Sequence, residues 1–424
     1  MLPDSWIKVQ LGEILINYQN GFAFSASEYV EEGVPIISMA NISLEGKFQY
    51  DAKTSKRWDE KYKDELEDFI VRKGDVIIAM TDVTPTKNLI GRMAEVTAEE
   101  IFLLNQRVGL LKIDDKKAFP KFISYVGNSG DWIKYCRSVA TQGAQANIST
   151  KDIRKGIIPL PPINEQQKIA EILSIVDEKI EVIEEKISKT LVLKKGLMQQ
   201  LLSKGIDHQT YIESAVGKIP ETWKCRQIGE IAKVIRGASP RPKGDPLFYG
   251  GEVPRLMVQD VTRDGKYVTP SIDFLTSEGA KKSRPMVAGS LVMVCSGEVG
   301  VPAILAVDAC IHDGFLGFTE INKDCDLEFL YYSFDSLRQS FHSSATHGGV
   351  FTNLTTGIVK DFLIALPPKQ EQIRIAKILS EVDLRIKVLN AKKELTIRLK
   401  QGLLKYLLFG KIRVTPLLQK ESIP

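Results

Sequence analysis

The chain has 424 residues, 43% of them hydrophobic and 26% charged, a composition that fits a soluble protein of two to four domains and excludes a disordered chain. Its formal net charge is only +4, which is low for a protein that holds nucleic acid mainly by phosphate attraction. No segment approaches the roughly 18 apolar residues of a membrane span, and the first residues lack the pattern of a secretory signal, so we expect a cytoplasmic protein with no membrane partner.

The first 157 residues predict a domain of mixed strands and helices. It opens with Pro3-Asp4-Ser5-Trp6 and the segment Leu11-Gly12-Glu13-Ile14. Apolar, β-branched runs such as Val34-Pro35-Ile36-Ile37 are followed by loops that contain glycine, which is typical of strands joined by turns. The turn Lys73-Gly74-Asp75 likewise precedes an apolar run, residues 76–80, which we interpret as a buried strand.

A long helix is predicted after this domain, from about Glu165 to Ser203. Pro161 and Pro162 cannot lie inside a helix but can precede one, and apolar residues then recur at spacings of four and three. At 1.5 Å per residue such a helix is on the order of 60 Å long, so it cannot bury its apolar stripe on one small domain. The stripe consists of Ile169, Leu173, Val176, Ile180, Ile183 and Ile187, and it resumes at Leu197 and Leu201.

The rest of the chain repeats the first half. Pro220-Glu221-Thr222-Trp223 and Ile228-Gly229-Glu230-Ile231 open a second domain, and Pro367-Pro368 precede a second helix. Residues 160–206 and 366–412 are identical at about 23 of 47 aligned positions, far more than helical composition alone would give. The stripe of the second helix consists of Ile375, Leu379, Val382, Ile386 and Leu389, and it resumes at Leu403 and Leu407.

The duplication predicts an α+β fold with a pseudo-two-fold internal repeat. Two similar mixed α/β domains are separated by two long α-helices, which we expect to pack as an antiparallel coiled-coil-like pair with one domain at each end. Two helices that lie separately on their own domains are the alternative. Thr190, Lys194, Thr396 and Lys400 interrupt the stripes at equivalent places, so the seam is expected to be irregular. The predicted parts are domain 1–157, helical spacer 158–206, linker 207–217, domain 218–363, helical spacer 364–412 and a tail, 413–424.

Charge is concentrated at the end of the chain. Residues 364–424 carry 13 basic and 5 acidic side chains, so the rest of the chain is slightly acidic. The first helix contains an acidic run, and the second is rich in lysine and arginine. Pairing between them would help to set the register of the helices, although solvated charged faces are the commoner origin of such runs. The acidic run consists of Glu178, Glu181, Glu184 and Glu185.

Catalytic sequence motifs are missing from the chain. It has no G-x-x-x-x-G-K-[ST] loop, no G-x-G-x-x-G after a strand, no H-E-x-x-H and no G-x-S-x-G. The Asn/Asp-Pro-Pro-aromatic motif of amino-methyltransferases is also missing, because both double prolines follow leucine. No two of the five cysteines have Cys-x-x-Cys spacing, and the closest metal-like grouping is only Cys310 with His312, so no metal site is predicted. We therefore expect a protein that is not an enzyme.

Together these motifs resemble the specificity subunit of a type I restriction-modification system. Two domains of about 150 residues are each opened by a Pro-x-x-Trp segment and closed by Leu-Pro-Pro-x-x-Glu-Gln and a long helix. The resemblance covers nearly the whole chain. The Leu-Pro-Pro-x-x-Glu-Gln motif alone is moderately specific, and its duplication at this spacing is highly specific.

The resemblance implies a non-catalytic subunit that binds double-stranded DNA. In this family each globular target-recognition domain reads one half of a bipartite, asymmetric DNA sequence, and the helical spacers set the distance between the halves. The spacers also dock modification subunits, which are methyltransferases, and a restriction subunit completes the nuclease. S-adenosylmethionine is then expected on the modification subunits, with no cofactor on this chain.

Candidate DNA contacts lie in stretches that differ between the halves, because binding residues favour loops on a shared scaffold. Asparagine and glutamine suit adenine, arginine suits guanine, and phosphate contacts set position. Asn147 and Asn353 recur in both halves, so we expect turn or helix-cap residues there. The candidates are Thr81, Thr84, Lys87, Asn88, Arg92, Gln142 and Gln145 in the first domain, and Arg236, Arg241, Lys243, Gln259, Arg263, Thr346 and His347 in the second.

A second hypothesis comes from a different class of protein. The chain would be a scaffold that joins partner subunits through its helical spacers and does not bind DNA. This hypothesis predicts no sequence-dependent retention of DNA, whereas a specificity subunit retains a two-part sequence.

Overall fold

The protein is described from a computed structural model that covers residues 3–84, 86–141, 143, 145–348 and 351–421, without the side chains of residues 346–348, 351–352 and 419–421. The chain forms two compact units, residues 1–184 with 391–424 and residues 185–390. Each unit contains one globular domain and one stretch of each long helix. Within the described residues, no helix combines the length and the apolar character needed to cross a membrane.

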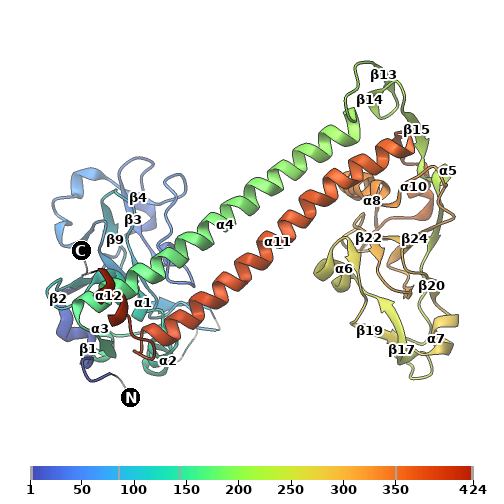
Figure 1. Cartoon of the computed structure of the whole chain (residues 1–424). Helices are drawn as coiled ribbons and strands as arrows, with labels where there is room; N and C mark the ends of the chain where they lie inside the picture. The colour runs from blue at the N-terminus through green and yellow to red at the C-terminus, as the bar shows by residue number, and fades with distance from the viewer. Residues whose placement is uncertain (1–2, 85, 142, 144, 349–350, 422–424) are drawn as a thin grey trace. The chain divides into compact units, whose positions relative to one another are not determined.

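The globular domain of the first unit contains two four-stranded sheets, in the orders β2-β10-β6-β8 and β4-β3-β9-β5 (Figure 1). The first sheet is antiparallel, and its apolar strand β6 is buried along its whole length. Two short pairs, β1-β12 and β7-β11, complete the domain. The strands are β1 (Ile7–Gln10), β2 (Leu15–Asn20), β3 (Val34–Ile37), β4 (Arg57–Trp58), β5 (Ile70–Val71), β6 (Val76–Ala79), β7 (Thr81–Asp82), β8 (Met93–Glu95), β9 (Phe102–Leu104), β10 (Val108–Ile113), β11 (Ala146–Asn147) and β12 (Ile157–Leu160).

Two short helices in this unit begin at side-chain caps. Ser129 accepts a hydrogen bond from the backbone of Trp132 at the start of α2, and Ser149 accepts one from Asp152 at the start of α3. The α-helices are α1 (Pro120–Val126), α2 (Gly130–Val139), α3 (Thr150–Lys155) and α12 (Thr415–Glu421), and the 3-10 turns are Leu11–Ile14, Ala26–Glu28, Met39–Asn41, Glu60–Tyr62 and Glu67–Phe69.

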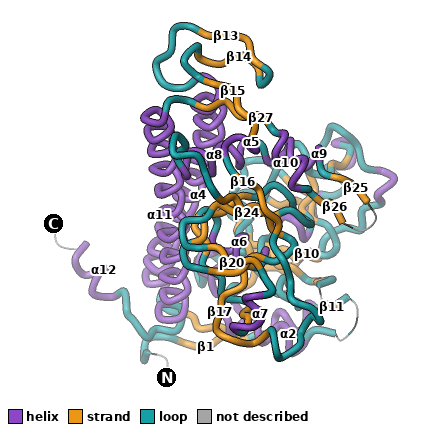
Figure 2. Tube along the Cα trace, turned by 90° about the vertical axis from the view of Figure 1, so that its right-hand side faces the viewer, coloured by secondary structure: helices purple, strands orange, loops and turns teal. Residues whose placement is uncertain are grey.

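The second unit repeats this plan. A five-stranded sheet has the order β16-β24-β21-β22-β18 and a four-stranded sheet the order β19-β17-β23-β20, with the pairs β15-β27, β13-β14 and β25-β26 (Figure 2). Its strands are β13 (Tyr211–Ser214), β14 (Gly217–Pro220), β15 (Lys224–Gln227), β16 (Lys233–Arg236), β17 (Tyr249–Leu256), β18 (Tyr267–Val268), β19 (Asp273–Leu275), β20 (Arg284–Met286), β21 (Leu291–Val294), β22 (Pro302–Leu305), β23 (Ala309–Ile311), β24 (Phe315–Thr319), β25 (Thr346–Gly348), β26 (Phe351–Asn353) and β27 (Leu363–Leu366).

The strand orders β2-β10-β6-β8 and β16-β24-β21-β22 correspond one to one, which confirms the predicted α+β class and the internal repeat. The helices correspond in the same way, with α8 and α9 in the places of α1 and α2, and α10 in the place of α3. The helices of the second unit are α5 (Ile228–Ile231), α6 (Val258–Asp264), α7 (Ser277–Lys281), α8 (Leu327–Ser336), α9 (Arg338–Ser344) and α10 (Thr356–Asp361).

Two long helices, α4 (Ile163–Lys204) and α11 (Lys369–Leu407), lie side by side, drawn green and red in Figure 1. In the first unit the early part of α4 meets the late part of α11, where Asp177 lies 2.6 Å from Lys400. In the second unit the late part of α4 meets the early part of α11, where Lys194 lies 2.7 Å from Asp383. The helices therefore run antiparallel, as predicted.

The apolar stripes begin inside the globular cores. Ile169 and Leu173 are fully buried in the core of the first unit, which also contains Leu407, the last residue of α11, and Leu408, which follows it. Ile375 and Leu379 are buried in the same way in the second unit. Farther along, the stripe of α4 remains buried, whereas that of α11 is half-buried. These farther residues are Val176, Ile180 and Ile183 on α4, and Val382, Ile386 and Leu389 on α11.

The duplicated Glu-Gln motif fixes the start of each long helix. The Oε1 atom of Gln166 accepts a hydrogen bond from the backbone N–H of Phe119 at 2.8 Å. Glu165 accepts hydrogen bonds from the Trp6 indole at 3.4 Å and from Arg413, after the end of α11, at 2.6 Å. Each motif therefore joins a domain, the start of one helix and the end of the other. In the second unit Glu371 accepts hydrogen bonds from the Trp223 indole at 3.1 Å and the Ile206 backbone at 3.0 Å, and Gln372 accepts one from the Asp326 backbone at 2.8 Å.

Only part of the acidic run of α4 forms ion pairs with α11. Glu184 lies 2.8 Å from Lys393 of α11, as expected. Glu181 is instead paired with Lys47 of the globular domain at 3.0 Å, and Glu185 with Lys189 of the same helix at 2.6 Å. Charge pairing between the two runs therefore cannot by itself set the register.

Candidate DNA interface

The loop after β7 is organised by a buried carboxylate. Asp82 is 1% exposed and accepts hydrogen bonds from the backbone N–H groups of Thr84 and Leu89, both at 2.7 Å. Burial alone would raise the pKa of Asp82, but these donors hold the pKa below its ordinary value, so the carboxylate stays charged. The two ends of the loop are thus tied to one charged group, and the exposed Thr84 lies on a fixed turn.

Thr81 does not belong to this exposed loop. It is buried, and its backbone pairs with Asn147 across the β7–β11 ladder. Its hydroxyl faces the sulfur of Met39 inside the domain. The strand pairing therefore turns the Thr81 side chain inward, and the predicted DNA contact at Thr81 lies inside the domain in this structure.

Several other candidates of the first domain come together. The Lys87 ammonium donates to the backbone carbonyl of Thr141 at 3.4 Å, and the Arg137 guanidinium donates to the backbone carbonyl of Lys87 at 2.9 Å and to the Asn88 side chain. Gln145 contacts Asn147 and directly precedes β11, which pairs with β7 at the start of this loop. We call this set the first loop cluster: Thr84, Lys87, Asn88, Arg137 and Gln145.

Arg92 contacts the backbone of this cluster. It is half-buried, and it donates to the backbone carbonyls of Asn88 at 3.1 Å and Asn128 at 3.4 Å. Burial, with the charge of Arg137 nearby, lowers the pKa of Arg92. Gln142, which was also predicted as a contact, lies outside the described residues.

In the second domain Asp313 contacts several residues of the loop that follows β16. Its carboxylate accepts a hydrogen bond from Ser239 at 2.6 Å and lies 3.8 Å from the Arg241 guanidinium. Its backbone carbonyl accepts from Arg236 at 3.0 Å, and Arg236 also donates to the Asn353 side chain at 3.2 Å. We call this set the second loop cluster: Arg236, Ser239, Arg241, Asp313 and Asn353.

Charge and exposure in the second loop cluster suit contact with a ligand. Arg236 and Arg241 are exposed, as is the neighbouring Lys243. Burial tends to raise the pKa of Asp313, but the Ser239 hydrogen bond and nearby positive charge hold the pKa below its ordinary value. The carboxylate is therefore charged near neutral pH and lies beside Arg241, whereas Arg236 is held by the Asp313 backbone carbonyl.

Gln259 and Arg263 lie apart from this cluster on α6. Gln259 is exposed. The N–H groups of Arg263, in contrast, bind other residues of the chain. Arg263 contacts Asp264 at 2.6 Å and Asp260 at 3.1 Å, and it donates to the Ser271 hydroxyl at 2.6 Å. The hydrogen bonds that Arg263 donates to the Asp264 carboxylate raise the pKa of Arg263. Arg263 therefore stabilises the turn after α6 in this structure.

Thr346 and His347 lie in β25, which pairs with β26. Their side chains are outside the described part of the chain. Their backbone belongs to the hairpin that ends at Asn353, so β25 adjoins the second loop cluster.

The two loop clusters adjoin equivalent strand segments of the repeated fold but come from different loops, since the first follows β7 and the second follows β16, the counterpart of β2. Asn147 pairs with Thr81 just after β6, and Asn353 pairs with Ser296 just after β21. Both asparagines are strand residues, and the helix caps expected there are supplied two residues later by Ser149 and Thr355. Sequence reasoning missed Arg137, Ser239 and Asp313; their proximity to the loops is a tertiary contact that linear spacing does not show.

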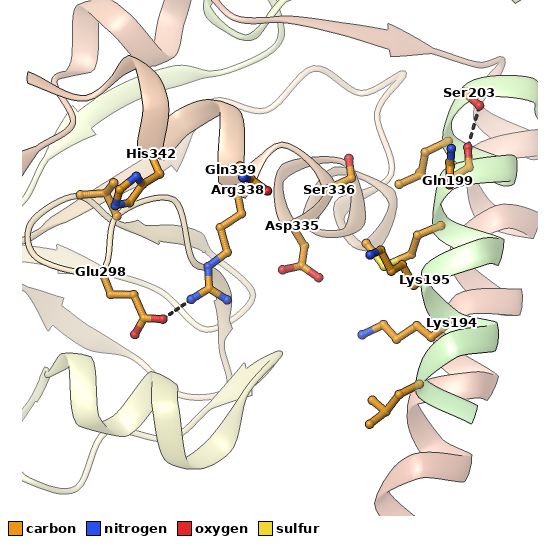
Figure 3. Close-up of a pocket in the computed structure, with 14 residues that line it drawn as sticks. Lys194, Lys195, Gln199, Ser203, Glu298, Asp335, Ser336, Arg338, Gln339 and His342 are labelled. Carbon is orange, nitrogen blue, oxygen red and sulfur yellow. Dashed lines mark hydrogen bonds and ion pairs between the residues drawn. The ribbon is translucent and has the colours of Figure 1, made fainter. Parts of the chain in front are cut away.

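A groove of about 1050 Å³ lies elsewhere in the second unit (Figure 3). Lys194 and Lys195 of α4 line one side, and Asp335 lines the other. Arg338 on that side is paired with Glu298. Burial raises the pKa of Asp335. No predicted DNA contact lines this groove, and no group of three or more metal-ligating side chains occurs among the residues described.

Comparison with known proteins places the repeat in a family. The model of the type I restriction modification DNA specificity domain matches residues 3–191 and again residues 220–397. The MjaX specificity subunit of a type I restriction enzyme from Methanocaldococcus jannaschii is 27% identical over 419 residues, covering 97% of this chain and 95% of the relative. The EcoBI specificity subunit of Escherichia coli is 25% identical over 275 residues, covering 61% and 51%.

Solved structures share the fold. A chain from a type I restriction-modification system, studied for its assembly and conformational transition, superposes with a TM-score of 0.58 at 17% identity, covering 97% of this chain and all of that one. The type I S subunit from M. genitalium superposes with a TM-score of 0.57 at 16% identity, covering 95% and 96%.

The chain contains two copies of one DNA specificity domain, together with two long helices. These features define a class of proteins that recognise DNA sequences. The chain belongs to the type I restriction-modification DNA specificity family, and it is a specificity subunit.

Proposed function

We propose that the two loop clusters read the two halves of a bipartite DNA target. The observation that carries this proposal is that both clusters adjoin the equivalent Asn147 and Asn353 strands of two copies of one fold but present different side chains. The first offers Lys87, Asn88 and Gln145, and the second offers Arg236 and Arg241. Because amides suit adenine and guanidinium groups suit guanine, the two copies are equipped for different base sequences.

The chain directs other subunits to the sequence that it reads. We assign adenine methylation, with S-adenosylmethionine, to modification subunits docked on the long helices, and DNA cleavage to a restriction subunit. Membership of the specificity family supports this division, as does the lack of catalytic motifs in the sequence. A scaffold that does not bind DNA is not favoured, because the matched family is one of DNA specificity domains.

Selection from a random DNA library tests the proposal. The chain, purified with its cognate modification subunit, is mixed with randomised duplexes, and the retained duplexes are sequenced. We expect enrichment of one motif with two fixed halves and a fixed gap. Retention without any enriched sequence would support the scaffold instead.

A further inference from the structure

Arg255 of β17 is a buried arginine that contacts the second loop cluster. It is only 6% exposed, and its guanidinium donates to the Asp273 carboxylate of β19 and, at 3.0 Å, to the Ser239 hydroxyl. The Ser239 hydroxyl in turn donates to the Asp313 carboxylate at 2.6 Å. A continuous series of hydrogen bonds therefore connects the Asp273 carboxylate with the Asp313 carboxylate of the loop cluster.

Tyr249 connects the same strand to the same loop. The guanidinium carbon of Arg255 lies 5.5 Å from the centre of the Tyr249 ring, and the Tyr249 hydroxyl donates to the Pro240 carbonyl at 2.8 Å. Pro240 follows Ser239 and precedes Arg241, which is exposed and is a candidate base contact. Since two side chains of β17 hold two successive residues of the loop, this strand fixes the backbone that carries Arg241.

The planar guanidinium suits Arg255 to a positioning role. Its N–H groups point in fixed directions within one plane. When one terminal nitrogen binds Asp273, the direction of the other is therefore set, and this other nitrogen binds Ser239. A lysine ammonium on its flexible stem is a single point charge, so lysine would keep the ion pair without fixing Ser239.

The repeat shows that the fold does not require a charged pair at this place. Arg255 pairs with Cys310 across the parallel strands β17 and β23, and Ile36 pairs with Leu103 across the corresponding strands β3 and β9. Ile36 is 5% exposed, so an apolar side chain fills the equivalent place in the first domain. Arg255 therefore meets a requirement that is particular to the second domain.

Stability alone does not explain Arg255 either. Removing a guanidinium from water is costly, and apolar side chains at such places are often equally stabilising or more so. The Nε–H group of Arg255 also has no acceptor among the described residues. What distinguishes Arg255 from an apolar residue is its hydrogen bond to the loop of the second loop cluster.

We propose that Arg255 is a positioning residue for base recognition by the second domain. It holds Ser239, and through Ser239 the loop that presents Arg241 to one half of the DNA target. This inference rests on the proposed function, in which the loop clusters read DNA. Because Arg255 is buried, it affects which base is bound without touching the DNA itself.

Competition binding with single-base variants of the target tests the inference, with the full chain and its cognate modification subunit. Arg255→Met with Asp273→Asn, the double variant, removes both charges, so no buried charge is left unpaired. We expect the preference for the correct base to fall by about tenfold at one position of one half-site, with the other half-site unchanged. The matched control is Lys281→Met with Glu278→Gln, an exposed pair on α7, which should keep both preferences.

Ser239→Ala removes the proposed link and leaves the pair of Arg255 with Asp273 intact. We expect Ser239→Ala to change the preference at the same base position. Combined with the double variant, it should lose no more preference than Ser239→Ala alone, because Arg255 acts through Ser239. Arg255→Lys should keep the wild-type Tm but not the wild-type preference.

Three results would overturn the inference. One is a double variant that melts at the wild-type Tm with both half-site preferences unchanged, since the ion pair would then be structural only. Another is Ser239→Ala with unchanged preferences. The third is equal weakening on every DNA sequence, which indicates lost phosphate contact. A wild-type chain that prefers no two-part sequence would instead contradict the proposed function, and the inference with it.

Discussion

Lys400 of α11 lies 2.6 Å from Asp177 of α4, and the Tyr125 hydroxyl donates to the same carboxylate at 2.8 Å. The repeat reproduces this contact in the second unit, where Lys194 lies 2.7 Å from Asp383 and Tyr332 donates to it at 2.6 Å. The lysines that interrupt the apolar stripes are therefore specific polar contacts in the seam. Such contacts favour one register of paired helices over others.

A double-mutant cycle of Lys400→Met and Asp177→Asn measures this contact. Both side chains are less than one-fifth exposed. We expect a coupling free energy of about 2 to 3 kcal/mol, between the values of exposed and buried ion pairs. Urea unfolding of the four variants gives the coupling. The exposed Lys189–Glu185 pair is the matched control and should show a much smaller coupling, because solvent screens it. Equal coupling for the two pairs would contradict the proposed role of Lys400.

The repeat made the fold predictable from the sequence. The contacts within the two loop clusters could not be predicted from it. The Leu-Pro-Pro tract and the stripes predicted the antiparallel helices, because periodicity and punctuation are local signals. Asp313 lies beside Arg236 although the two residues are 77 positions apart in the sequence, and no local signal reports this contact. Thr81 was predicted to be exposed but is buried, because a polar residue beside a turn can equally belong to a buried strand, here β7.

Arg241→Ala should relax the specificity of one half-site. Arg241 is exposed and lies near Asp313, so it is held in place and open to a base. We expect a loss of about 1 to 3 kcal/mol in binding at one position of one half-site, with the other half-site unchanged. Competition binding with single-base variants of the target gives this loss.

Arg263→Ala is the matched control for Arg241→Ala. Its donors are taken by Asp260 and Asp264, so we expect reduced thermal stability without altered base preference. The opposite pattern, with base preference changed by Arg263→Ala and unchanged by Arg241→Ala, would refute the assignment.

His312 should make stability fall at mildly acidic pH. Burial, followed by the positive charge of Arg255, lowers the pKa of His312 below its ordinary value of 6.5. The unfolded chain then binds the proton more readily than the folded chain, so stability is lost as pH falls below 6.5, by at most about 1.4 kcal/mol per pH unit. Urea unfolding between pH 7.5 and 5.5 measures this loss. It should be smaller in His312→Gln, and equal losses in both proteins would contradict the prediction.

The paired helices should act as a ruler on the DNA. One helical turn inserted into both helices, after Glu185 and after Ala391, keeps the Lys400–Asp177 and Lys194–Asp383 contacts. A turn adds about 5.4 Å, so we expect the gap to lengthen by one or two base pairs of about 3.4 Å, with both half-sites unchanged. Sequencing of retained DNA checks this. Altered half-sites with an unchanged gap would refute the ruler.

Recognition of a two-part DNA sequence is the central claim, and methylome sequencing tests it most directly. A host without adenine methylation expresses the chain with its cognate modification subunit, and modified adenines are mapped across its genome. The account predicts one new asymmetric motif, with two fixed halves separated by a gap of constant length. Soluble, associated proteins that leave no gapped motif in the genome would contradict it.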